Sequence, residues 1–163
     1  MTKRLCVLAL LLAFAVSLFG CGGDVSFTFL DINLTLPHGY REEAAPESAN
    51  MLLTDGQSTV TVKRLSIIDA EEQGISGSYS DKQFAEFFLI RSGIDSNIAS
   101  YGDVPYYSYY ESSEAGKLFC ISAFYRTPYA YYIVIFATAS ARESEARGEF
   151  FEIMSSVTYN IVN

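Results

Sequence analysis

The chain has 163 residues, half of them hydrophobic, and a formal net charge of −8 at pH 7. This length suits one domain, and the apolar content excludes a chain that is disordered throughout. The acidic balance argues against a nucleic-acid partner, because phosphate binding needs a basic face and the lysines and arginines are scattered. Twelve tyrosines and twelve phenylalanines without a tryptophan indicate a core rich in β-strands.

The first twenty residues are typical of a secretory leader. A short basic head precedes an almost unbroken apolar run over residues 5–19, and Gly20 follows. A helix of that length would measure about 22 Å, which is short of the roughly 30 Å hydrocarbon core of a bilayer. We therefore expect a cleaved signal peptide, and an uncleaved membrane anchor is the alternative.

The segment Leu18-Phe19-Gly20-Cys21 resembles the lipobox of bacterial lipoproteins, in which the cysteine is lipidated and becomes the new N-terminus. The resemblance implies more than one acyl chain on Cys21, which suffices for stable attachment to a bilayer. We expect a lipoprotein signal peptide at 1–20, a lipidated tether at 21–25 and a single α+β domain at 26–163. The domain would then face away from the cytoplasm, anchored to the bacterial cell membrane or envelope.

Lipidation would leave Cys120 as the one cysteine with neither a lipid nor an intrachain partner, because Cys6 departs with the signal peptide. Reactive thiols need basic, partly exposed surroundings, whereas Cys120 lies in an apolar stretch. We interpret Cys120 as a small buried core residue, and a reactive thiol is the alternative.

Alternating apolar residues predict strands early in the domain. Residues 32–36 form a strand with its apolar positions inward, and the Pro37-His38-Gly39-Tyr40 sequence ends it in a turn. Residues 51–54 and 58–65 flank Asp55-Gly56, which predicts a hairpin. Residues 66–69 are expected to extend its second strand, with loops at 41–50 and 70–79.

Two capping boxes predict two helices. Ser80 and Gln83 open a helix over residues 81–92 that Gly93 ends. Its expected buried stripe is Phe84, Phe87 and Phe88, widened by Leu89 and Ile90. Ser140 and Glu143 open a second helix that runs to about residue 155. The inner stripe of that helix is Ala146, Phe150, Ile153 and Met154. A short strand is expected to follow, in which Val157, Tyr159 and Ile161 alternate.

The most apolar part of the chain predicts a central hairpin. Residues 117–126 and 130–138 are rich in aromatic and β-branched residues, and the bend at Pro128 is too short for a crossover connection. In the second arm, both faces are apolar, which predicts a central strand covered on both sides. One face carries Tyr132, Val134 and Phe136, and the other carries Tyr131, Ile133 and Ile135.

The strand expected at 104–111 supplies the candidate binding surface. Tyr107 and Tyr109 fall on one face of this strand, and Tyr106 and Tyr110 on the other. Tyrosine offers stiff amphipathic contact area, so an exposed row of these residues would suit a peptide or a glycan. The alternative is that these tyrosines divide between the core and ordinary cross-strand pairs.

The sequence assigns no catalytic residue, no metal site and no cofactor. His38 is the single histidine and follows a strand in a turn, and no serine lies in a recognisable nucleophile elbow. A zinc site needs three or four suitable ligands, which the chain does not offer in any motif. A pair of carboxylates assembled by the fold stays open.

The expected order of elements is strand, turn, hairpin, capped helix, tyrosine-rich strand, long hairpin and terminal helix. Together with residues 36–40, with Tyr131, Ile133 and Val134, and with residues 150–157, this order resembles the Mog1/PsbP-like domains of many small bacterial lipoproteins. The resemblance covers roughly residues 27–157. It implies an antiparallel sheet of about six or seven strands flanked by two main helices, an α/β/α sandwich. It implies no shared catalytic residue, since members of the family serve mostly as accessory or binding modules.

We therefore expect a lipid-anchored envelope protein that acts as a non-catalytic accessory, binding or scaffolding module. Its expected partners are the membrane, through the acyl chains on Cys21, and a protein or peptide, with no nucleic acid. The alternative is a ligand-binding lipoprotein with a tyrosine-lined cleft for peptide or glycan. A hydrolase is the third and less favoured interpretation.

Overall fold

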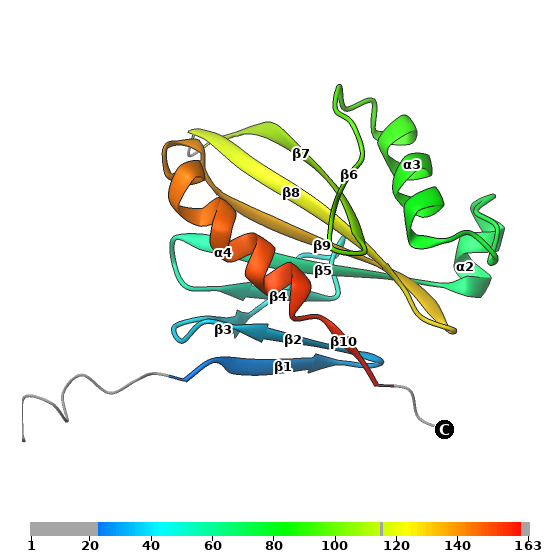
Figure 1. Ribbon diagram of the computed structural model, residues 1–163, viewed down its shortest axis with the longest axis horizontal. Coiled ribbons are helices and arrows are strands. Elements are labelled where there is room, and N and C mark those ends of the chain that lie inside the picture. Colours follow the sequence, from blue (N-terminus) through cyan, green and yellow to red (C-terminus); the bar gives the residue numbers. More distant parts are fainter. Residues whose placement is uncertain (1–22, 115, 161–163) are drawn as a thin grey trace, which may run out of the picture.

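The computed structural model describes residues 23–114 and 116–160, which form an α+β fold of two antiparallel sheets with flanking helices (Figure 1). The expected signal peptide and the cysteines at positions 6 and 21 lie outside the described residues, as does Ile161. No helix in the described part is long and apolar enough to cross a membrane.

A seven-stranded sheet dominates the fold, and every pair of neighbouring strands in it is antiparallel. In spatial order its strands are β3 (Arg41–Glu43), β4 (Met51–Thr54), β5 (Ser58–Ser66), β9 (Ala130–Ala139), β8 (Gly116–Arg126), β7 (Val104–Ser113) and β6 (Ala99–Tyr101). A smaller sheet has the order β1 (Val25–Phe29), β2 (Ile32–Leu36) and β10 (Thr158–Tyr159). The final strand expected from the sequence is thus present and pairs with β2.

Two layers cover the large sheet, one on each face (Figure 1). Helix α4 (Glu143–Ser155) and the small sheet cover one face, where Tyr132, Val134 and Phe136 of β9 are buried. Helices α2 (Ile67–Glu72) and α3 (Asp81–Ser92) lie over the other face, against Tyr131 and Ile133 of the same strand. The prediction that the central strand is buried on both sides is confirmed.

The central hairpin is also confirmed. Strands β8 and β9 pair without interruption from Leu118 opposite Ala139 to Arg126 opposite Tyr131. The hydroxyl of Thr127 closes the bend, because it accepts hydrogen bonds from the backbone N–H groups of Tyr129 and Ala130 at 3.2 and 3.1 Å. Those contacts fix the turn that the sequence marked by its proline.

The capping box of α3 is present, and Gly93 ends the helix in the left-handed conformation with φ 65°. The buried stripe differs from the prediction, because Phe84 and Ala85 face the core while Ile90 is 82% exposed. At about 100° per residue, Ile90 lies roughly a third of a turn or more from both buried positions. Phe87, Phe88 and Leu89 are half-buried at the margin.

The prediction of a second capping box at Ser140 is wrong. Ser140 begins a 3-10 turn, η1 (Ser140–Arg142), and α4 starts after it with Arg142 at the N-cap and no side-chain cap. Glu143 does not reach back to the backbone. Its carboxylate instead accepts hydrogen bonds from Arg147, one turn further along α4, and from Tyr110 of β7, and these two contacts take the place of the capping box.

The region around Ser66 also differs from the sequence prediction. The strand ends at Ser66, whose hydroxyl accepts the Asp69 N–H at 3.1 Å and caps α2. The expected continuation at 66–69 is therefore present at Ser66 and wrong at 67–69. Part of the loop expected at 70–79 is therefore helical. The loop expected at 41–50 contains the short edge strand β3.

Capping supplies a direct test of these assignments. Replacing Ser80 with Ala should lower the free energy of unfolding by about 1 kcal/mol, because the N–H of Gln83 loses its partner. The matched change Ser140→Ala should cost less than about 0.5 kcal/mol, since that hydroxyl caps nothing. Urea denaturation followed by circular dichroism measures both, and equal losses would contradict the assignment.

Candidate binding groove

The layer of α2 and α3 lies over one end of its face of the large sheet (Figure 1). The uncovered part of that face carries a groove of about 550 Å³. Residues from β5, β9, β8 and β7 form its floor, and the loop before β4 and the segment after α3 border it. We call it the sheet groove, and its lining is Pro46, Ser48, Thr61, Lys63, Ile94, Tyr109, Tyr110, Glu111, Leu118, Cys120, Ile135 and Ala137.

Strand register explains why these side chains meet. Thr61 lies opposite Ile135, and Cys120 lies between Ala137 and Tyr109 on its neighbouring strands. Residues directly opposite each other share a face, so four strands present one continuous surface. Seven of the twelve lining residues are half-buried, and six carry apolar side chains, a mixture of contact area and polar groups that suits a ligand.

The four tyrosines divide as their parity predicts. Tyr107 is buried beneath α3, and Tyr109 on the same face is half-buried in the sheet groove. On the opposite face Tyr106 packs against Phe151 of α4, with ring centroids 5.3 Å apart, and Tyr110 is 51% exposed at the edge of the sheet. The structure therefore brings Tyr109 and Tyr110 to the groove and places Tyr106 and Tyr107 elsewhere. A binding role for the tyrosines stays a prediction.

Tyr110 is held in place from two sides. The Nζ atom of Lys117 lies 4.1 Å from the centre of its ring, and its hydroxyl donates a hydrogen bond to Glu143. Arg147 donates to the same carboxylate at 2.6 Å and packs over Phe119. Hydrogen bonds from Arg147 and Tyr110 lower the pKa of Glu143, which stays charged at neutral pH. These residues, which we call the Tyr110 cluster, fix the rim of the groove.

Cys120 lies in the floor of the groove and is 2% exposed. Burial raises the pKa of its thiol to about 11, so the side chain is protonated at neutral pH and is a poor nucleophile. The interpretation of Cys120 as a small buried core residue is confirmed, and among the described residues it has no disulfide partner.

His38 is exposed in its turn and does not line the groove. Within residues 23–114 and 116–160, no group of three or more histidine, cysteine or acidic side chains is placed to hold a metal ion. The groove therefore presents contact area, one lysine, one glutamate and tyrosine hydroxyls, and these groups suit binding.

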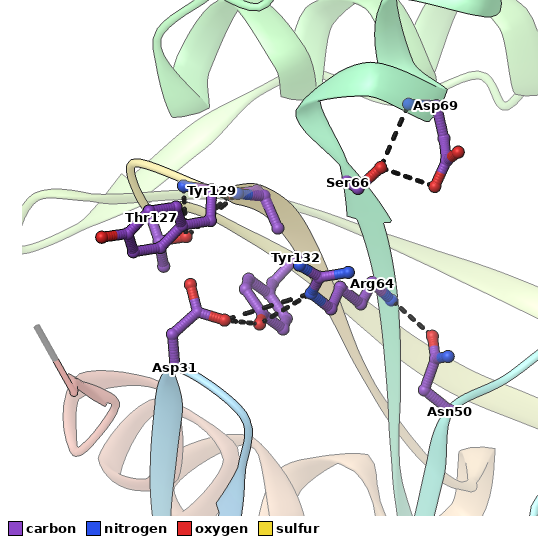
Figure 2. A network of polar contacts seen from close by, with 9 residues as sticks. Asp31, Asn50, Arg64, Ser66, Asp69, Thr127, Tyr129 and Tyr132 are labelled. Atoms are coloured by element: carbon purple, nitrogen blue, oxygen red, sulfur yellow. Dashed lines mark hydrogen bonds and ion pairs between the residues drawn. The ribbon is translucent and has the colours of Figure 1, made fainter. Parts of the chain in front are cut away.

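A polar network lies on the opposite face of the large sheet from the groove (Figure 2). The hydroxyl of Tyr132 donates to the carboxylate of Asp31, and Nε of Arg64 donates to that hydroxyl at 3.2 Å. Arg64 also lies 4.0 Å from the carboxylate, and the Asn160 N–H donates to the Asp31 carbonyl at 2.9 Å. Asp31 belongs to the turn between β1 and β2, so this network joins the small sheet to the large one.

Charge in this network is set by competing effects. Burial alone would raise the pKa of Asp31, but the Thr127 and Tyr132 hydroxyls and the Arg64 guanidinium together hold that pKa below its usual value. Burial and the bond to Asp31 raise the pKa of Tyr132 to about 12. The network is therefore an anion held by neutral and cationic donors, an arrangement that stabilises structure.

The sequence-based prediction did not include Lys63 or Asp31 among the site residues. Thr61 and Lys63 alternate with the buried Val60 and Val62, and this pattern indicates a sheet face that is not fully covered. Nothing local marks Asp31, because Arg64 and Tyr132 reach it from distant parts of the chain.

No protein-family model matches this chain, and no curated protein matches its sequence. Solved structures share its fold. A protein from Bacteroides thetaiotaomicron VPI-5482 is 11% identical with a TM-score of 0.60, over 85% of this chain and 49% of that protein. The chain thus spans about half the length of the Bacteroides protein.

Cyanobacterial PsbP from Synechocystis sp. PCC 6803 is 11% identical with a TM-score of 0.54, over 87% of this chain and 95% of that one. The Ran-binding protein Mog1p from Saccharomyces cerevisiae is 10% identical with a TM-score of 0.48, over 83% and 95% of the two chains. The fold expected from the resemblance, a Mog1/PsbP-like α+β sandwich, is confirmed. At these identities the likeness concerns the fold alone.

The Asp31 network predicts a pH-dependent contribution to stability. A pKa lowered by folding stabilises the protein above the unfolded value near 3.9, and this stabilisation is lost as the pH falls through the lower folded value. Replacing Asp31 with Asn should lower the free energy of unfolding by about 1 to 2 kcal/mol at pH 7. The difference from the wild type should shrink below about pH 4. Urea denaturation at several pH values measures it, and a constant difference would contradict the prediction.

Proposed function

We propose that this protein is a lipid-anchored component of the bacterial cell envelope that acts by binding and not by catalysis. The lipobox-like segment ending at Cys21 supports the anchor. The sheet groove is the single observation that supports binding, because it is a concave contact surface of about 550 Å³ that combines six apolar with six polar or charged side chains. The shared fold with PsbP from Synechocystis is compatible with an accessory module.

Among the ligands expected from the sequence, a peptide suits the groove better than a glycan. Its floor is formed by aliphatic side chains such as Leu118, Ile135 and Ala137. Sugar hydroxyls need closely spaced hydrogen-bonding groups, whereas apolar peptide side chains need contact area with a few polar groups at the margin. The described lining supplies such groups in Tyr109 and Lys63.

The anchor is tested by replacing Cys21 with Ala in the full chain expressed in a bacterium. The variant should lose incorporation of radiolabelled palmitate and should either leave the membrane fraction or keep its leader, because no acyl chain is attached. Fractionation, metabolic labelling and mass spectrometry measure these outcomes. A cleaved variant that stays in the membrane fraction would contradict the proposal.

Binding at the groove is tested by photo-crosslinking in intact cells. Benzoylphenylalanine at Ser48, an exposed rim residue, should give an adduct of discrete mass. Adding Ala137→Phe should reduce this adduct at least fivefold, because the new ring fills the groove. The same probe at exposed Glu72 on α2 is the control. Equal adducts at both positions, or none at Ser48, would overturn a binding role for the groove.

A further inference from the structure

We propose that the free edge of β7, from Tyr110 to Ser113, takes up an extended segment of a partner protein, which adds to the sheet as one more strand and carries basic side chains. The inference rests on the proposed binding function and names the chemistry of its partner. An unpaired strand edge recognises another backbone directly, through main-chain hydrogen bonds.

The edge is free because its neighbour is short. Strand β7 has ten residues, but β6 pairs only with Val104, Pro105 and Tyr106. No described strand pairs with the remaining residues of β7 on that side. The side chains from Tyr110 to Ser113 are exposed, and nothing in the described chain covers them as α3 covers Tyr107.

The backbone of this edge has a defined direction. The Ser108 carbonyl accepts the Ser96 hydroxyl at 2.8 Å, and Ser96 lies in the segment just before β6. Backbone groups of alternate residues point to the same side of a strand. The N–H and C=O groups of Tyr110 and Ser112 therefore face outward, and those of Tyr109 and Glu111 face β8.

Natural sheets usually blunt such an edge with proline, lysine or a bulge. Here the register of β7 with β8 runs unbroken from Tyr106 to Ser113, so there is no bulge. The one proline, Pro105, lies in the part that β6 already covers, and the uncovered part contains no lysine. Its only charged side chain is Glu111, so the edge stays open to another strand.

The free edge begins at a side chain that is held in place, and it borders a hollow. The Tyr110 cluster holds the Tyr110 side chain, so this residue loses little conformational entropy when a second strand pairs with it. A hollow of about 430 Å³ lies beside the edge, and Ile94, Asp95, Phe119 and Arg147 are among the residues that line it. Alternate side chains of an added strand would enter this hollow.

Charge indicates which partner fits. Among the described residues Asp95, Glu111 and Lys117 form no ion pair, whereas Arg147 is paired with Glu143. The Lys117 ammonium lies over the Tyr110 ring, so two carboxylates and one lysine remain unpaired near the edge, and the whole chain carries −8. A basic segment complements the two carboxylates and the negative net charge. A second copy of this chain would bring Asp95 and Glu111 beside their own counterparts, which opposes symmetric pairing of two edges.

The test uses the full chain as the protein sample. The probe is the hexapeptide Lys-Val-Lys-Val-Lys-Val, acetylated at its N-terminus and amidated at its C-terminus. In nuclear magnetic resonance the amides of Tyr110 and Ser112 should exchange rapidly with solvent in the free protein. They should become at least tenfold slower when the peptide is bound. A copy of the peptide with alternate backbone nitrogens methylated should bind at least tenfold more weakly, because it cannot pair as a strand.

Variants separate backbone pairing from charge. Ser112→Pro removes one outward N–H without touching the ladder to β8 and should weaken binding about tenfold, while Ser112→Ala should have no effect. Glu111→Lys keeps the backbone and should also weaken binding about tenfold. This variant keeps the test informative should the proline variant not fold.

Several results would overturn the proposal. They are the absence of peptide binding, equal binding of the methylated peptide, binding without protection of Tyr110 and Ser112, or protection of these amides in the free protein through self-association. The Ser48 crosslink reports on the groove alone. An adduct at Ser48 without pairing at the edge would overturn the inference and leave the proposed function standing. Pairing at the edge without an adduct at Ser48 would exclude the groove as the binding site.

Discussion

Burial of β9 on both faces is the constraint on which the fold depends. Its alternating residues must be covered by separate layers, since Tyr132 and Tyr131 face opposite ways and both are fully buried. One layer is α4 with the small sheet, and the other is α2 with α3. The twelve residues of α3 span about 18 Å, whereas the eleven residues of β8 span about 37 Å. The helical layer is therefore too short for the sheet, and the sheet groove is the part that it leaves bare.

Sequence patterns predicted the elements whose signals are local or strongly periodic. The two arms of the central hairpin, the capping box at Ser80 and the stop at Gly93 were all identified because each depends on neighbouring residues. The errors have different causes. Glu143 bonds to Arg147 of its own helix and to distant Tyr110 instead of the Ser140 backbone. The cap at Ser66 is a local signal that was overlooked within an apparent strand extension.

The candidate site was predicted only in part, for reasons of the same kind. The alternation of side chains along the strand correctly placed Tyr109 and Tyr110 on opposite faces. It could not predict that α3 covers Tyr107 and ends before it reaches Tyr109. The open face depends on the lengths of elements that are far apart in the sequence. So does the Asp31 network, whose members come from the β1–β2 turn, β5 and β9 and meet because the two sheets pack together (Figure 2).

Strand β7 borders both proposed binding surfaces, the sheet groove and the free edge. Its odd-numbered side chains, Tyr109 and Glu111, face the sheet groove, and the backbone groups of Tyr110 and Ser112 face the open edge. A strand added at this edge would continue the sheet, so the half of its side chains on the side of Tyr109 would extend the groove wall. The groove is uncovered because the helical layer stops short, and its border strand is unpaired because β6 ends after three residues. A binding function built on this corner needs no reactive group, and the buried thiol of Cys120 at its floor serves as packing.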